Sequence, residues 1–449
     1  MSILIVLVFS ISTLVLSKYL FKKWFNHLLI YTLAWTVFLV LYELKFIRYI
    51  EISNEAFYIF FITQVGMISG ALTVYFARNV FKENKTDMNG LRMHSVLFND
   101  DFIILKAVIV FTSLVGFFSA YQTWTLLLEK FGNITTIILR ANLIYRMRVA
   151  GELELGIPYI SILPYAGVVF SGIYTAAKNK ITFYTFLPIT AIIIKDSATA
   201  GRGGVFVAMV MLGTSFFLFR HAVSKNPIAE VVSSTKKLVL GSVMLITIVV
   251  TCLVLVLEFR GRYEAFKGKT NVFNQVEGIP LMNASMYFYF SSNMGVFSKY
   301  YELQDENTMI GENTFLPFYN LIAKFDIVKK PNYYPKGYNI PSWSNAATYL
   351  KEIHADFGDV GLFLIPYLMS LLSAFYWYRF YEKGDMISFT CLVYLFTMNA
   401  FAVFDMLTRT AFFMMSFLFI LLLIPVTEKY WNRSKQNSHQ NHFLASEEI

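Results

Sequence analysis

One run of the sequence, residues 344–361, gathers side chains suited to acid–base chemistry just before a long apolar stretch. Ser344 suits a helix N-cap, so we expect a helix over most of this run. At about 100° per residue, Glu352 and Asp356 fall on one side of that helix and His354 on another. Any of the three can accept a proton from a hydroxyl group. The alternative is structural, with a carboxylate capping the next helix and an ordinary hydrogen-bonded histidine.

A second run, residues 196–204, is rich in glycine and reads Asp-Ser-Ala-Thr-Ala-Gly-Arg-Gly-Gly at the start of an apolar segment. Glycines let the backbone bend, and the free N–H groups of the next helix point at whatever lies above them. With Arg202 between Gly201 and Gly203, the run predicts an anion site suited to phosphate. A plain turn with an arginine reaching toward lipid headgroups fits the same spacing.

Other arginines lie beside apolar segments. Arg260 and Arg262 follow one such segment, and Arg140, Arg146 and Arg148 lie in a shorter loop earlier in the chain. Forked guanidinium donors suit a pyrophosphate, which carries several negative charges. Contact with lipid headgroups is the alternative for each of them.

A short connector, residues 406–408, lies between Asp405 and Arg409. The spacing of four residues predicts an ion pair between these two side chains. Ionisable groups at the ends of membrane spans are tolerated because they reach the interface. We therefore expect this pair to be structural.

The composition indicates that the elements positioning these residues lie in a membrane. The chain has 449 residues, of which 56% are hydrophobic, 18% aromatic and only 15% charged, and its formal net charge is +9. Soluble domains are about 25% charged. The basic residues are spread over connectors rather than forming a stripe, which favours anionic lipid over nucleic acid as a partner. Cys252 and Cys391 both lie in apolar runs, and the chain has no CxxC or HExxH motif, so we expect neither a disulfide, nor a metal, nor a cofactor.

Long apolar runs can be counted as helical spans, because each crossing of the hydrocarbon needs roughly 20 residues with every backbone group paired. The sequence predicts an all-α polytopic membrane protein with eleven spans. Spans 1–8 lie in a bundle at 1–258, a large loop follows at 259–359, spans 9–11 lie at 360–427, and a polar tail, expected to be disordered from 432, occupies 428–449. Within the loop, residues 282–301 are expected to form one aromatic, amphipathic helix at the membrane interface. The predicted spans are 2–18, 27–44, 56–77, 102–126, 157–177, 181–196, 204–220, 238–258, 360–379, 386–404 and 410–427.

Lysine and arginine predict the direction of the spans, since they accumulate in cytoplasmic connectors. One alternating set of connectors is strongly basic and the other is not, apart from a few residues such as Lys45 and Arg48. This predicts an N-terminus outside, a C-terminus in the cytoplasm, and the loop at 259–359 on the outer side. The basic set is Lys18, Lys22, Lys23, Arg78, Lys82, Lys85, Arg92, Lys178, Lys180, Arg220, Lys225, Lys236, Lys237, Arg379 and Lys383.

Together these features resemble the oligosaccharide repeat-unit polymerases (O-antigen polymerases of the Wzy type). The resemblance rests on the Gly201–Gly203 turn, on the large late outer loop, and on the Thr-Tyr-Leu…Asp-Phe-Gly-x-x-Gly pattern over 348–361. The topology extends over nearly the whole chain, while the residue motifs cover only about 196–206 and 345–361. This chain departs from the family in lacking one arginine motif repeated in both outer loops.

The resemblance implies a GT-C-like helical fold and a metal-independent glycosyltransferase in the bacterial cytoplasmic (inner) membrane. The donor would be a glycan on undecaprenyl pyrophosphate, and the acceptor a sugar hydroxyl of a second lipid-linked unit. A chain-length regulator and a flippase of the same pathway are implied partners. An O-antigen ligase shares this fold and donor, and a transporter or flippase of the lipid-linked unit is the other alternative, although repeated halves are not seen.

Overall fold

The computed structural model describes residues 3–80, 95–98, 100–140, 143–144, 147–148, 152–153, 157, 160–198, 201, 203–223, 272, 274–276, 284–306, 308–331 and 336–447. Side chains are described as far as residue 429. Within these ranges, seven helices are long and apolar enough to cross a membrane. Every predicted span coincides with a helix except 238–258, which lies outside the described residues. The long helices are α1 (Ile3–Phe21), α3 (Asn54–Val80), α4 (Ile103–Phe131), α7 (Leu163–Lys178), α9 (Gly203–Val223), α15 (Tyr349–Lys383) and α17 (Ala411–Glu447); shorter ones are α2 (His27–Glu43), α8 (Phe183–Ser197) and α16 (Met386–Phe401).

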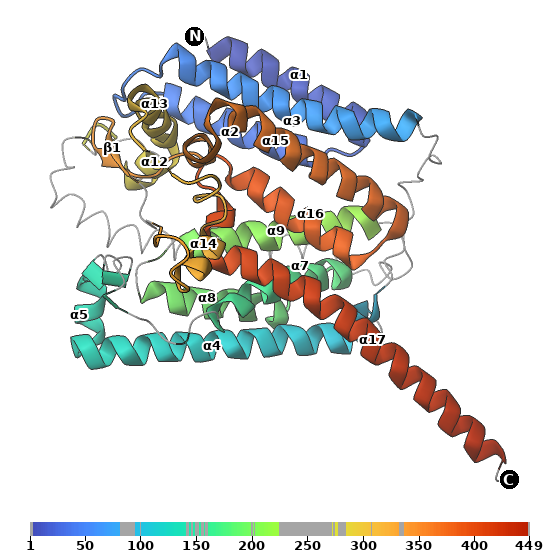
Figure 1. The fold of residues 1–449 in the computed structure, drawn as a ribbon. Helices are drawn as coiled ribbons and strands as arrows, with labels where there is room; N and C mark the ends of the chain where they lie inside the picture. The colour runs from blue at the N-terminus through green and yellow to red at the C-terminus, as the bar shows by residue number, and fades with distance from the viewer. Residues whose placement is uncertain are drawn as a thin grey trace.

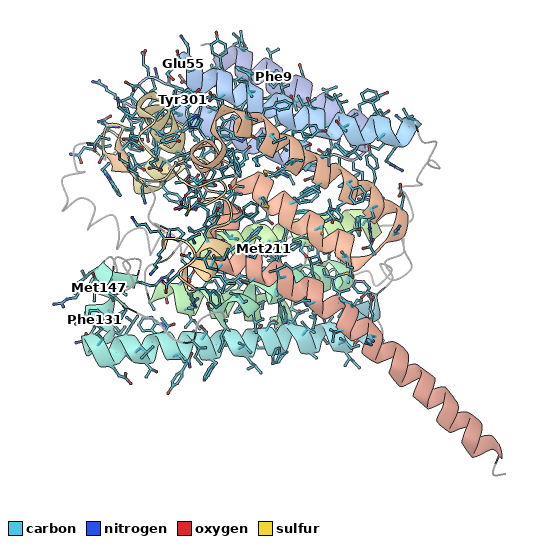
Figure 2. All side chains as sticks on the ribbon, viewed as in Figure 1. Phe9, Glu55, Phe131, Met147, Met211 and Tyr301 are labelled. Atoms are coloured by element: carbon cyan, nitrogen blue, oxygen red, sulfur yellow. The ribbon has the colours of Figure 1, made fainter. Side chains whose placement is uncertain are left out.

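The helices form two groups of four, and two further helices, α16 and α17, pack against them (Figure 1). One group contains α1, α2, α3 and α15, and the other contains α4, α7, α8 and α9. Between them lies α16, which packs against α2, α9 and α15, while α17 packs against α7 and α16. Side chains fill the space between the ribbons, with Met211 of α9 fully buried near the centre (Figure 2).

Two glycines let α3 and α15 approach closely. A Cβ atom at Gly66 would lie 2.7 Å from the carbonyl oxygen of Phe363, and one at Gly70 would lie 2.2 Å from that of Tyr367. The spacing is the small-x-x-x-small pattern by which membrane helices pack backbone against backbone. This contact fixes α15, which also carries Glu352, His354 and Asp356, against the first group of helices.

One end of the bundle carries the basic connectors of the predicted cytoplasmic side. Arg78 at the end of α3 forms an ion pair with Glu382 near the end of α15. The ammonium group of Lys23 lies over the ring of Tyr381, 4.6 Å from its centroid. The structure therefore brings the ends of α1, α3 and α15 together on one side, as the charge pattern requires.

The described part of the loop at 259–359 packs at the opposite end (Figure 1). It contains α12 (Ala284–Ser291), α13 (Asn293–Leu303), α14 (Leu316–Ala323) and a short antiparallel pair, β1 (Tyr338–Asn339) and β2 (Trp343–Ser344). The expectation of one surface helix over 282–301 is wrong, because the chain forms two helices and α13 is buried on nearly all sides. Polar residues of both helices have interior partners: Ser291 Oγ of α12 lies 2.6 Å from Tyr49 Oη, and Asn293 Nδ2 of α13 donates to Val403 O at 2.8 Å.

The polar tail is helical as far as Glu447, where the sequence predicted disorder from 432. It continues α17 past Pro425 and extends away from the helical body (Figure 1). Extending an existing helix adds one hydrogen bond for each residue fixed, which is far less costly than starting a new helix. A polar composition therefore did not end this helix.

Candidate functional site

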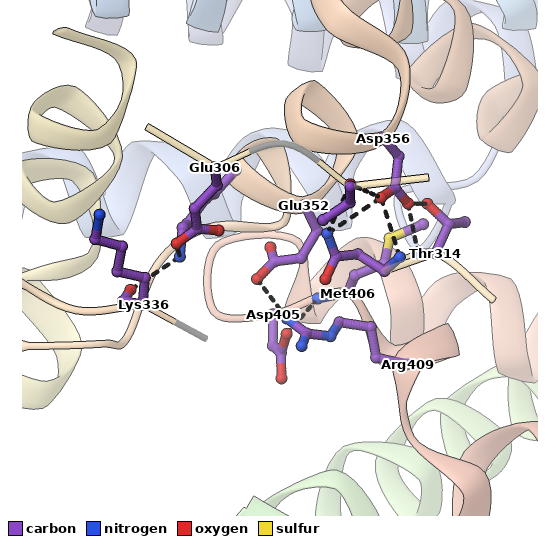
Figure 3. Close-up of polar contacts among 11 residues, drawn as sticks. Glu306, Thr314, Lys336, Glu352, Asp356, Asp405, Met406 and Arg409 are labelled. Atoms are coloured by element: carbon purple, nitrogen blue, oxygen red, sulfur yellow. Dashed lines mark hydrogen bonds and ion pairs between the residues drawn. The ribbon is translucent and has the colours of Figure 1, made fainter. Parts of the chain in front are cut away.

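A buried ion pair lies between the start of α15 and the short 3-10 helix η6 (Leu407–Arg409) (Figure 3). Arg409 Nη1 donates to Glu352 Oε1 at 2.9 Å. Only 4% of Glu352 and 6% of Arg409 is exposed. The second carboxylate oxygen, Glu352 Oε2, has no hydrogen-bond partner among the described residues. The pair thus presents one unused acceptor oxygen beside a fixed positive charge.

Asp405 is the third ionisable group of this cluster (Figure 3). The sequence predicted Asp405 as the partner of Arg409; in the structure the guanidinium group donates to Glu352, from a different helix, and Asp405 interacts with Arg409 electrostatically. Asp405 Oδ1 accepts the backbone N–H of Met406 at 2.8 Å. Burial raises the pKa of Asp405, although the positive charges of Arg409 and Lys351 act in the opposite direction. Two carboxylates therefore share the field of one arginine, which favours keeping a proton in the cluster.

Lys351 faces a different set of partners from its neighbour Glu352. Its ammonium group lies 2.8 Å from Glu306 Oε1 and donates to the carbonyl oxygen of Lys336 at 2.9 Å. The Lys351 side chain is only 1% exposed and lies near the rings of Tyr300 and Tyr338. A buried ammonium group is tolerated only where such partners are present. Lys351 therefore ties the long loop to the start of α15.

A second tie joins Asp305 to the β1–β2 hairpin. Lys336 Nζ and Tyr338 Oη both donate to the Asp305 carboxylate. Burial alone would raise the pKa of Asp305, but these two donors outweigh it and hold the pKa below its usual value. The hairpin is thus fixed over the same end of the bundle as the Glu352–Arg409 pair.

Asp356 accepts hydrogen bonds on both carboxylate oxygens from one segment, residues 308–314. Its Oδ1 accepts from Thr308 Oγ1 at 2.8 Å and from the backbone and side-chain nitrogens of Asn313 at 3.0 and 3.1 Å. Its Oδ2 accepts from the backbone N–H and hydroxyl of Thr314 at 2.7 and 2.8 Å. With its acceptor positions in use, Asp356 is better suited to holding this segment than to removing a proton from a substrate.

The segment that Asp356 holds continues into α14, which covers η6. α14 packs against η6 and against α17. Arg409 is the last residue of η6, so α14 and the preceding turn lie over the ion pair. Asp356 consequently positions the cover of the Glu352–Arg409 pair.

His354 lies on the other side of the same helix, near water. Its Nδ1 lies 2.8 Å from Tyr300 Oη, and its Nε2 lies 3.4 Å from Asp359 Oδ1. The hydroxyl of Tyr301 donates to the same Asp359 oxygen at 3.0 Å. The His354 side chain is 12% exposed, whereas that of Asp359 is 74% exposed. The histidine is therefore held between two tyrosines and an acid, in the arrangement that orients an imidazole for proton transfer.

The glycine-rich turn has a carboxylate where the sequence predicted a bound phosphate. α8 ends at Ser197 and α9 begins at Gly203, and the N–H of Gly201 donates to the carbonyl oxygen of Asp196 at 2.8 Å. Asp196 accepts the backbone N–H of Val205, and a Cβ at Gly204 would lie 2.3 Å from Asp196 Oδ2. The chain itself thus supplies a carboxyl group at the N-terminus of α9, where the sequence predicted a phosphate. The sequence carries a signal for this contact, because Asp196 opens the glycine-rich run.

The earlier arginine-containing loop folds back onto this turn. It forms a small apolar cluster with the end of α4, and Figure 2 shows Phe131 and Met147 side by side there. Trp124 Nε1 donates to the carbonyl oxygen of Ile194 at 2.8 Å, and Arg148 interacts electrostatically with Lys195 and Asp196. The exposed Arg140 belongs to the same loop. The predicted pyrophosphate ligands Arg146, Arg202, Arg260 and Arg262 lie outside the described residues.

Among the described residues, no three His, Cys, Asp or Glu side chains gather where they could hold a metal ion. Comparisons with protein-family models, with curated proteins and with solved structures find no match to this chain.

Proposed function

We propose that this protein is a GT-C-like polysaccharide polymerase with eleven spans in a bacterial cytoplasmic membrane. It would join oligosaccharide repeat units carried on undecaprenyl pyrophosphate. The observation that supports this proposal best is the buried Glu352–Arg409 pair, with its unused Glu352 Oε2, at the end of the bundle that carries the long loop. A base and a cation fixed near a membrane surface are the groups that a lipid-linked sugar transfer needs.

In the proposed reaction, Glu352 acts as the base. A sugar hydroxyl of the acceptor attacks the anomeric carbon of the donor glycan, and its proton passes to the carboxylate. The bond between that carbon and the pyrophosphate oxygen breaks, and the lipid pyrophosphate leaves with the electron pair. The positive charge of Arg409 favours the ionised form of Glu352, which is the form that accepts the proton. His354 is the alternative base, because its imidazole is oriented and lies closer to water.

The leaving pyrophosphate requires positive charge in the transition state. Arg202, Arg260 and Arg262 are the proposed donors, with Arg146 from the earlier loop. Arg148, which belongs to the same loop as Arg146, interacts electrostatically with Asp196 at the start of the glycine-rich run. This contact supports the assignment because it brings the earlier loop close to the Gly201–Gly203 turn.

The proposal is tested by glycan chain length in cells that lack the gene and carry variants at equal membrane abundance. Glu352→Gln removes the base while keeping its shape, and we expect single lipid-linked units to accumulate. His354→Gln tests the alternative base. Glu302→Gln is the matched control, because Glu302 is 61% exposed in its side chain and pairs only with Lys299 among the contacts described. If Glu352→Gln still makes long polymer and His354→Gln does not, His354 is the base.

A reaction with purified protein separates the three classes of function. A polymerase lengthens a glycan that remains on its pyrophosphate lipid, whereas a ligase moves the glycan to another acceptor. A transporter forms no new glycosidic bond. Long polymer from both variants, or no glycosidic bond with purified protein, would refute the proposal.

A further inference from the structure

The segment that covers the ion pair, residues 309–330, exposes large apolar side chains. The exposed fraction is 78% for Ile310, 70% for Phe325 and 72% for Ile327, and Leu321 and Ile322 of α14 are also exposed. Single exposed apolar residues are common on proteins, but these five and Phe315, which is 45% exposed, lie within eighteen residues and form a patch. The patch faces away from the body, since the opposite face of α14 packs against η6 and α17.

The end of this segment is basic. Lys324, Lys329 and Lys330 are exposed beside the apolar residues, against the single acid Asp326. Lysine side chains next to an apolar face are typical of elements that lie in the membrane interface, where the ammonium groups reach lipid phosphates. The charge therefore points to an anionic lipid surface as the partner of the patch.

The position of α14 along the bundle agrees with this partner. α15 bends at Gly358, which has a φ of 61°. Asp359 comes next, with its side chain 74% exposed, and Val360, 72% exposed, begins the apolar outer surface of the long helix. This change from acid to apolar residues marks the boundary between water and hydrocarbon. Asp356 fastens the 308–314 turn two residues before the bend, so the segment lies at that boundary.

We propose that residues 309–330 form a membrane-interface element that lies in the lipid leaflet at this end of the bundle. Ile310, Phe325 and Ile327 insert among the lipid tails, and Lys324, Lys329 and Lys330 contact headgroup phosphates. The segment that covers the Glu352–Arg409 pair is then itself covered by lipid, so a lipid-linked molecule reaches the pair from within the leaflet. The position of the segment in lipid does not depend on the reaction proposed above.

The test measures the depth of a fluorescent label in lipid nanodiscs. Single cysteines replace Phe325 or Ile327 in a chain carrying Cys252→Ser and Cys391→Ser, and each is labelled with a nitrobenzoxadiazole group. Glu302→Cys on α13 is the control, because it is exposed at the same end without apolar neighbours of this kind. Nanodiscs of phosphatidylcholine and phosphatidylglycerol carry a doxyl quencher near the headgroup, and iodide quenches from water.

We expect the labels at 325 and 327 to be quenched several-fold more by the doxyl lipid than the label at 302, and several-fold less by iodide. Replacing all three lysines by glutamine should reduce the doxyl quenching in nanodiscs with phosphatidylglycerol. Equal iodide quenching at all three sites would overturn the proposal. Labels shielded from both quenchers would also overturn it, because a second copy of the chain would then cover the patch.

Discussion

The guanidinium group of Arg409 and the carboxylate of Glu352 are 57 residues apart in the chain and 2.9 Å apart in space. The two residues are brought together by the α15–α16 hairpin, whose return leads directly into η6. Neither side chain is more than 6% exposed. A charge in this position depends on its partner, because an isolated buried ion is strongly disfavoured.

Replacing Arg409 with leucine should destabilise the protein strongly. The change leaves Glu352 buried without its partner, which costs on the order of 3–5 kcal/mol. Thermal unfolding in detergent measures the loss. Lys299→Ala is the control, because the Lys299–Glu302 pair is partly exposed and is expected to contribute about 0–1 kcal/mol. Similar losses in the two variants would show that the buried pair contributes no more than a surface pair.

Replacing Asp356 with asparagine should loosen the segment at 308–314. The carboxylate accepts from two backbone N–H groups, Asn313 and Thr314, and an amide has only one acceptor oxygen. Hydrogen exchange should therefore become faster at these two amides, while the amides in the middle of α3 stay unchanged. Unaltered exchange combined with lost polymer would instead indicate a direct chemical role for Asp356.

The cluster around Asp405 should make stability fall as pH rises. Burial raises the pKa of this group in the folded protein above its usual value of 3.8. The folded state therefore holds the proton at pH values where the unfolded chain has released it, and stability declines as pH rises from that value through the folded pKa. Asp405→Asn removes this contribution. The Tm of the variant minus that of the parent should increase from pH 4 to pH 7, and a constant difference would contradict the raised pKa.

Close packing of α3 against α15 predicts that an alanine at Gly70 destabilises the protein, whereas an alanine at a glycine outside this contact does not. Gly70→Ala places a Cβ 2.2 Å from the carbonyl oxygen of Tyr367, so the helices must separate. Such overpacking costs about 1–3 kcal/mol. Gly213→Ala in α9 is the control, because a Cβ there meets nothing within 4 Å. Its thermal stability should be unchanged or slightly higher, and equal destabilisation of both variants would show that the α3–α15 contact is not tight.

The two ends of the bundle should lie on opposite sides of the membrane. A reporter fused after Lys383 is expected in the cytoplasm, and one inserted after Lys329 is expected outside, following the basic connectors. Paired alkaline phosphatase and fluorescent-protein fusions measure this directly. Equal signals at both positions would contradict the predicted orientation. They would also contradict the placement of the Glu352–Arg409 pair on the outer side of the membrane.

Local sequence alone was enough to locate the long apolar helices. Apolar runs predicted helices at the right places from α1 to α17, including the proline-containing α8, because a chain in hydrocarbon must pair its backbone within each span. The run at 344–361 also predicted that Glu352 and His354 face different sides of one helix, and in the structure they contact different partners, since the helical repeat fixes that relation. The eighth predicted span, 238–258, lies outside the described residues.

Tertiary structure decided what each polar group does. Asp405 was the obvious partner of Arg409 from spacing, yet Glu352 reaches the same guanidinium from a distant helix. Asp356 suits a base by residue type, but Asn313 and Thr314 donate to its two carboxylate oxygens. α13 looked like a surface helix because an aromatic, mixed sequence does not reveal whether neighbours cover both faces. Periodicity records only which residues share a face of a helix, whereas burial and pairing depend on segments far apart in the chain, which meet only when the helices pack.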